Sequence, residues 1–66
     1  MYQRYVDLLE KHNTTTYQVC KETGVAQSTI SMWKTRAEKD DKATIGIFDL
    51  KKIADYFNVS VDYFLT

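Results

Sequence analysis

Apolar residues recur along this chain at intervals of three and four positions, with charged and polar residues between them. That spacing is typical of amphipathic α-helices, which place one apolar stripe against a core. The sequence therefore predicts an all-α fold of five helices. They are expected at residues 2–12, 16–23, 27–36, 45–57 and 61–65.

The ends of these helices are predicted from residues that start or stop helical backbone. Gly24 and Asn58 tolerate the left-handed conformation in which many helices end. A hydroxyl at the N-cap can accept a hydrogen bond from a free amide of the first turn. This role is expected for Thr15, Thr44 and Ser60. Residues 38–43 (EKDDKA) are charged and aperiodic, which predicts an exposed loop.

The apolar stripes of the five helices predict one small shared core. A chain of 66 residues forms one domain, here residues 1–66, and buries only about 60% of its unfolded surface. The residues expected in the stripes are Tyr2, Tyr5, Val6, Leu9, Val19, Cys20, Thr23, Ile30, Trp33, Ala37, Ile47, Leu50, Ile53, Ala54, Phe57, Val61, Phe64 and Leu65.

Composition and charge limit the class of protein. An apolar fraction of 44% argues against disorder. Nine basic and nine acidic residues cancel, which disfavours a nonspecific nucleic-acid coat but leaves specific binding open. No apolar run approaches the roughly 20 residues that span a bilayer, and no signal peptide opens the chain. A cytoplasmic protein without a membrane partner is expected.

Few side chains here suggest catalysis or metal binding. Cys20 is the single cysteine, so it cannot form an internal disulfide, and a small buried side chain is its expected role. His12 has no cluster of cysteines or carboxylates around it. No serine, cysteine or carboxylate has a histidine at plausible catalytic spacing. We therefore expect no metal, no cofactor and no enzymatic activity, and no small-molecule ligand is evident.

The second and third helices are separated by a short turn that contains Gly24, which is the arrangement of a helix-turn-helix unit. Counted from Thr16 as position one, position five must be small so that the helices cross closely, and Cys20 stands there. Position nine must turn, and Gly24 stands there. Positions four, ten, fifteen and eighteen must fill the core between the helices. They are Val19, Val25, Ile30 and Trp33.

Thr16 to Trp33 (TYQVCKETGVAQSTISMW) resembles the helix-turn-helix of phage-repressor and Cro-type regulators, also called the xenobiotic-response-element family. Ile53 to Leu65 (IADYFNVSVDYFL) resembles the closing segment of the same family. The resemblance implies a compact five-helix, lambda-repressor-like DNA-binding domain, with the helix-turn-helix unit at about residues 16–36. Three features depart from the family pattern: Cys20 in place of alanine, no glycine soon after the third helix, and a longer loop before the fourth.

The polar face of the third helix carries the residues expected to contact bases. In the family, a glutamine at the position of Gln27 often hydrogen-bonds adenine, and a side-chain amide pairs bidentately with adenine N6 and N7. Ser28 and Ser31 can reach a base, or in the case of Ser31 a phosphate. Met32 is an apolar residue on a polar face, and contact with a thymine methyl would explain it. Alternatively, Gln27 is a solvated helix start and Met32 a stray exposed methionine.

Residues on both sides of these positions are candidates for phosphate contacts, which position a protein without reading sequence. Thr16 begins the second helix, where free amides and the helix dipole favour an anion. Tyr17 has a hydroxyl that can reach a phosphate. Lys34, Thr35 and Arg36 lie at the far end of the third helix. For Lys34 and Arg36, an ordinary solvated surface is the alternative.

Two aromatic residues suggest self-association. Phe48 falls on the polar side of the fourth helix and Tyr63 on the last helix, and exposed aromatics often mark interfaces. Family members commonly dimerise through C-terminal helices, which implies a homodimer, at least on DNA, at a palindromic operator in double-stranded DNA. The alternative for Phe48 is that the long loop folds over it.

The sequence thus predicts a sequence-specific DNA-binding regulator, bacterial or phage-like, acting as a repressor or Cro-type protein. A protein-interaction module of the same fold without DNA binding is the alternative from another class. An antitoxin that represses its own operon is the alternative within DNA binding.

Overall fold

Five α-helices form the part of the chain that a computed structural model describes, residues 1–65. Their order and bounds are α1 Tyr2–Lys11, α2 Thr16–Thr23, α3 Gln27–Lys39, α4 Ile47–Tyr56 and α5 Asp62–Leu65. The all-α, five-helix fold predicted from the hydrophobic pattern is therefore confirmed.

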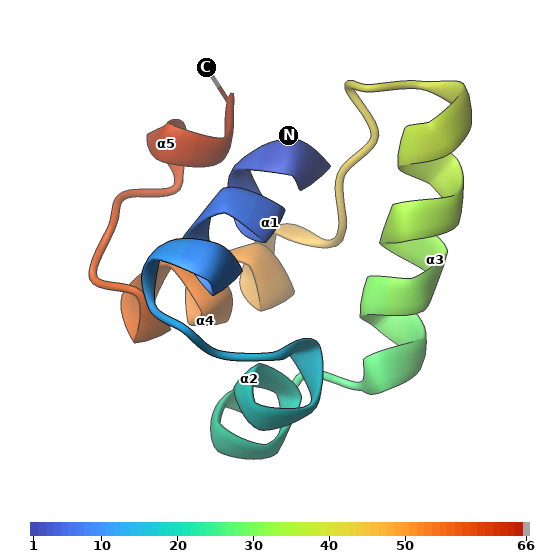
Figure 1. The fold of residues 1–66 in the computed structure, drawn as a ribbon. Coiled ribbons are helices and arrows are strands. Elements are labelled where there is room, and N and C mark those ends of the chain that lie inside the picture. The colour runs from blue at the N-terminus through green and yellow to red at the C-terminus, as the bar shows by residue number, and fades with distance from the viewer. Residues whose placement is uncertain (66) are drawn as a thin grey trace.

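The helices pack around one another rather than in layers. α1 packs against α3 and α5, while α2 packs against α3 and α4. Figure 1 shows α3 standing along one side of the molecule, with α2 near its N-terminal end. The segment between α3 and α4 runs back beside α3 before α4 begins. α3 is thus supported by other helices on one side only.

One apolar core joins all five helices, and it contains most of the residues that the stripes predict. Leu8 and Ile45 are buried although the pattern did not assign them to the core. Ile47 and Leu65 were predicted to be buried, and this is wrong, because their side chains are 60% and 56% exposed. The core consists of Tyr5, Leu8, Val19, Cys20, Val25, Ile30, Trp33, Ile45, Leu50, Ile53, Ala54, Phe57 and Phe64.

The difference at Ile47 follows from where α4 begins. Thr44 was predicted to cap this helix, but the N-cap is Gly46, and the Thr44 hydroxyl donates to the carbonyl of Ile45. The helix therefore starts later than expected, and Ile45 enters the core from the preceding segment. α3 also differs, because it continues to Lys39, whereas the charged residues 38–43 predicted a loop. Charged side chains on an exposed helical turn need no partner in the core.

α5 begins at Asp62, so Ser60 does not directly precede it as its predicted cap. The ends of α2 and α4 agree better with the sequence. The Thr15 hydroxyl accepts a hydrogen bond from the amide of Gln18, as an N-cap does. Gly24 has φ +83° at the end of α2, and Asn58 has φ +58° just after α4. Both residues occupy the left-handed region that the sequence predicted for them. Thr15 and Gly24 thereby fix the length of α2.

Candidate nucleic-acid interface

The turn between α2 and α3 is held by one threonine side chain and by the buried residues on each side. The Thr23 hydroxyl donates to the carbonyl of Val19 at 2.7 Å and accepts from the amide of Val25 at 3.2 Å. Val19, Val25 and Ile30 are buried together with Cys20 and Trp33, as the helix-turn-helix positions predict. This role of Thr23 was not predicted, and only its place before a left-handed glycine could have suggested it.

Trp33 fixes α3 from the core side. Its indole N–H donates to the carbonyl of Ala43 at 2.8 Å, which ties the segment after α3 back to the helix. Its ring also lies 5.3 Å from that of Tyr2 and 5.5 Å from that of Tyr5, both on α1. The buried face of α3 is thereby packed against α1 and the long connection, and the opposite face is left free.

The free face of α3 carries the four residues that were predicted to contact bases. All four are exposed, and the side chain of Met32 is 52% exposed although apolar. Because a helix turns once every 3.6 residues, these positions fall within less than half of its circumference. The structure therefore brings together Gln27, Ser28, Ser31 and Met32 on one outward surface.

Lys34 and Arg36 lie on opposite flanks of that surface. They are two residues apart, and two residues correspond to about 200° of rotation around a helix. Lys34 lines a hollow beside α1, whereas Arg36 lines a second hollow beside Ile45 and Gly46, where α4 begins. Both side chains are exposed. A duplex seated on the free face would meet one cation on each side.

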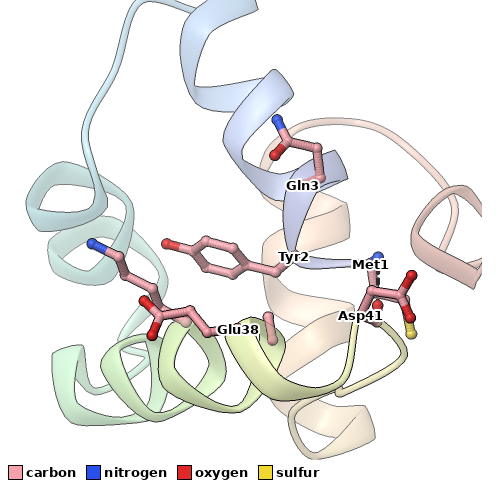
Figure 2. A pocket seen from close by; sticks show the side chains of 7 residues that line it. Met1, Tyr2, Gln3, Glu38 and Asp41 are labelled. Carbon is pink, nitrogen blue, oxygen red and sulfur yellow. Dashed lines mark hydrogen bonds between the residues drawn. The ribbon is translucent and has the colours of Figure 1, made fainter.

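The hollow beside Lys34 has a volume of about 300 Å³ and lies between the start of α1 and the C-terminal half of α3. In Figure 2 the ring of Tyr2 extends from α1 across this space, and the carboxylate of Glu38 rises from α3 beneath it. Asp41 lies at the end of the hollow next to Met1. This surface is mixed in charge and lies beside the proposed base-contacting face, not on it.

Three residues that carry a hydroxyl were predicted to contact phosphate, and their hydroxyls differ in the hydrogen bonds they already make. Tyr17 is exposed. The Thr35 hydroxyl donates to the carbonyl of Ser31 at 3.1 Å, so a phosphate contact by its hydrogen requires that bond to break. The Thr16 hydroxyl lies 2.8 Å from the hydroxyl of Tyr5. Burial of Tyr5 was predicted but this bond was not, although a tyrosine in place of phenylalanine at a buried position implies a partner for its hydroxyl.

A hydrogen bond between exposed side chains joins α2 to α4 behind the turn. The Tyr56 hydroxyl donates to the carboxylate of Glu22, which also accepts from the side-chain amide of Gln18. The hydrogen bond from Tyr56, and to a smaller extent that from Gln18, lower the pKa of Glu22. The bond to Glu22 raises the pKa of Tyr56. The bond adds a polar contact to the apolar packing of α2 on α4.

The two aromatic residues predicted at a dimer interface have different surroundings. Phe48 is 81% exposed, so the alternative in which the long loop covers it is wrong. Tyr63 is half-buried, with the guanidinium of Arg4 over its ring at 5.0 Å and the ring of Phe64 at 5.5 Å. Phe48 is therefore the freer of the two apolar surfaces.

Comparison with known families gives one match. Residues 7–64 match a helix-turn-helix family model. The chain belongs to the phage-repressor and Cro-type helix-turn-helix family. Searches of curated proteins and of solved structures gave no significant match.

The helix-turn-helix match covers nearly all of the chain, including the turn, α3 and the closing helices. The family is one of DNA-binding regulators rather than enzymes, so this chain carries a DNA-binding domain. No helix within residues 1–65 has the length and apolar character needed to cross a membrane. Over the same residues, no three His, Cys, Asp or Glu side chains gather where they could hold a metal ion.

Proposed function

We propose that this helix-turn-helix domain is a sequence-specific transcriptional regulator of the repressor or Cro type, which places α3 in the major groove of double-stranded DNA. One observation supports this proposal. One face of α3 is packed in the core, and the opposite face exposes a group of polar residues and one methionine: Gln27, Ser28, Ser31 and Met32. An amide, two hydroxyls and a thioether suit hydrogen bonds to base edges and contact with a thymine methyl.

In this arrangement phosphates on the two sides of the groove are held by different parts of the domain. Lys34 and Arg36 supply a cation on each flank of α3. Thr16 and Tyr17 approach the backbone from the start of α2, where the first amides of the helix have no intrahelical acceptor. Thr35 contributes only if its bond to Ser31 opens.

A single domain measures 27 × 23 × 22 Å and contacts only a few base pairs through one helix. We therefore infer that two copies bind a palindromic operator, with half-sites about one helical turn, roughly 34 Å, apart. The exposed ring of Phe48 is the surface that favours contact between the copies.

The salt dependence of duplex binding tests the proposal. Each neutralised phosphate contributes about 0.9 to the slope of log K against log salt concentration. Replacing Lys34 or Arg36 with alanine should weaken binding to all duplexes and reduce that slope by about 1. Lys52→Ala is the matched control, because Lys52 is exposed on α4 and is not among the predicted DNA contacts, so it should leave the slope unchanged.

A domain that binds no duplex even at low salt would contradict the proposal and favour a module that binds protein. Equal slopes for the wild type and both α3 variants would show that DNA binds elsewhere on the domain.

A further inference from the structure

The buried hydroxyl of Tyr5 forms a hydrogen bond with the hydroxyl of Thr16. The Tyr5 side chain is 0% exposed, and its ring lies 5.7 Å from that of Tyr2 and 5.5 Å from that of Trp33. Within residues 1–65, the hydrogen-bond partner of its hydroxyl is Oγ1 of Thr16, at 2.8 Å. The same side chain therefore touches α3 through Trp33 and α2 through Thr16.

The direction of this bond follows from burial. Leaving a buried donor without a partner costs about 1–3 kcal/mol, and the phenol hydrogen of Tyr5 is buried. Burial also raises the pKa of Tyr5 to about 12, so the phenol keeps that hydrogen at neutral pH. Thr16 is only partly buried, so its own hydrogen can reach an acceptor outside the protein. The favoured arrangement has Tyr5 donating and Thr16 accepting.

The hydroxyl hydrogen of Thr16 is then not donated to a backbone carbonyl. It is the first residue of α2, and Thr15 before it already accepts from the amide of Gln18. A threonine inside a helix commonly donates to the carbonyl four residues back, as Thr23 and Thr35 do here. For Thr16 the residue four positions back is His12, which lies at the end of α1 and not in α2, so this helical bond is not formed.

We propose that Tyr5 is a positioning residue for DNA binding. It makes no contact with DNA, but by donating to Thr16 it orients the Thr16 hydroxyl so that its hydrogen is donated to a phosphate. This inference rests on the proposed function, and in particular on the phosphate contact at the start of α2. It adds a role for α1, which otherwise only packs behind the helix-turn-helix unit. One buried phenol then orients a group on α2 while its ring supports α3.

Tyr5→Phe tests the inference, with a duplex selected by the wild-type domain as the probe. The variant keeps the ring against Trp33 and removes only the donor, so affinity should fall about three- to tenfold, the worth of one hydrogen bond. The salt slope should stay the same, because no charge is lost. Tyr2→Phe is the matched control, since Tyr2 also lies against Trp33, and its affinity should equal that of the wild type.

A double-mutant cycle separates positioning from general loosening of the fold. Thr16→Val removes the hydroxyl and should lower affinity, while Thr16→Ser should preserve it. Tyr5→Phe added to Thr16→Val should cause no further loss, because both changes act on one contact. Additive losses, or wild-type affinity in Tyr5→Phe, would overturn the inference while leaving the proposed function intact.

Two further outcomes are decisive. If Tyr5→Phe loses its helical circular dichroism, the comparison of Thr16→Val with Thr16→Ser carries the test, and equal affinities for these two overturn the inference. If the wild-type domain binds no duplex, the proposed function fails, and this inference fails with it.

Discussion

Trp33 shows how one residue couples the core to the face of α3 that we propose contacts DNA. Its ring packs against α1, and its indole N–H holds the connection after α3 through the carbonyl of Ala43. The register of Trp33 beside Ile30 predicted its burial, because helical periodicity is a local property. Its partner ten residues away could not be predicted, because the path of the connection depends on tertiary packing.

Replacing Trp33 with phenylalanine should lower the free energy of unfolding by about 1–3 kcal/mol, since it removes a hydrogen bond and leaves space beside Tyr2 and Tyr5. Urea unfolding followed by circular dichroism measures this loss. A change below about 0.5 kcal/mol would mean that the bond to Ala43 contributes little.

In the candidate site, too, local periodicity predicted which side chains are exposed but not which side chains bond across helices. Exposure of Gln27, Ser28, Ser31 and Met32 was predicted, because it depends only on which face of α3 is buried. The bonds of Thr16 to Tyr5 and of Glu22 to Tyr56 were not, because each joins helices distant in sequence. The pairing of two polar side chains across helices leaves no periodic pattern.

At the scale of elements, the turn between α2 and α3 decides how α3 is presented. Gly24 adopts φ +83°, and a Cβ built there would meet no atom within 4 Å. The requirement for glycine is therefore one of backbone conformation and not of space. Gly46 is equally open but has φ −54°, which any residue adopts.

Gly24→Ala should thus destabilise the domain by about 1–2 kcal/mol, the cost of the left-handed conformation for a residue with a Cβ. Gly46→Ala is the matched control. Its reduced freedom in the unfolded chain offsets the weaker capping by alanine, so its effect should stay within about 0.5 kcal/mol. Thermal unfolding of both variants gives the comparison, and equal losses would contradict this account of the turn.

The start of α4 was the element that the sequence predicted least well. Thr44 has the residue type of an N-cap, but burial of Ile45 and the bond from Trp33 to Ala43 accompany a stretch that is not helical until after Gly46. Tertiary contacts here override a local preference of about 1 kcal/mol. By contrast, α2 starts where Thr15 predicts, because no distant contact competes for that residue.

At the scale of the whole molecule, a neutral domain must bind DNA through the placement of its charges. Its nine basic and nine acidic residues leave no excess of positive charge, so we expect DNA affinity to depend on a few directed contacts and on the proposed second copy. Phe48 is the most exposed of the large apolar side chains described, and it lies outside the core.

Phe48→Ser should leave folding unchanged and weaken binding to a palindromic duplex about tenfold or more, as expected for an aromatic residue central to an interface. Binding to a single half-site should not change. Lys51→Ser, a neighbouring exposed change on α4, is the control. Gel-shift titrations on both duplexes measure the effect, and an equal loss on the half-site would place Phe48 against DNA instead.

The central claim, that α3 reads bases, is tested most directly by selection of bound sequences from random duplexes with the wild-type domain and with Gln27→Ala. The wild type should enrich a palindrome with an adenine at a fixed position in each half-site. The variant should lose that preference, worth about 1–3 kcal/mol, and keep the others. An unchanged preference in Gln27→Ala, or no enriched sequence for the wild type, would contradict the claim.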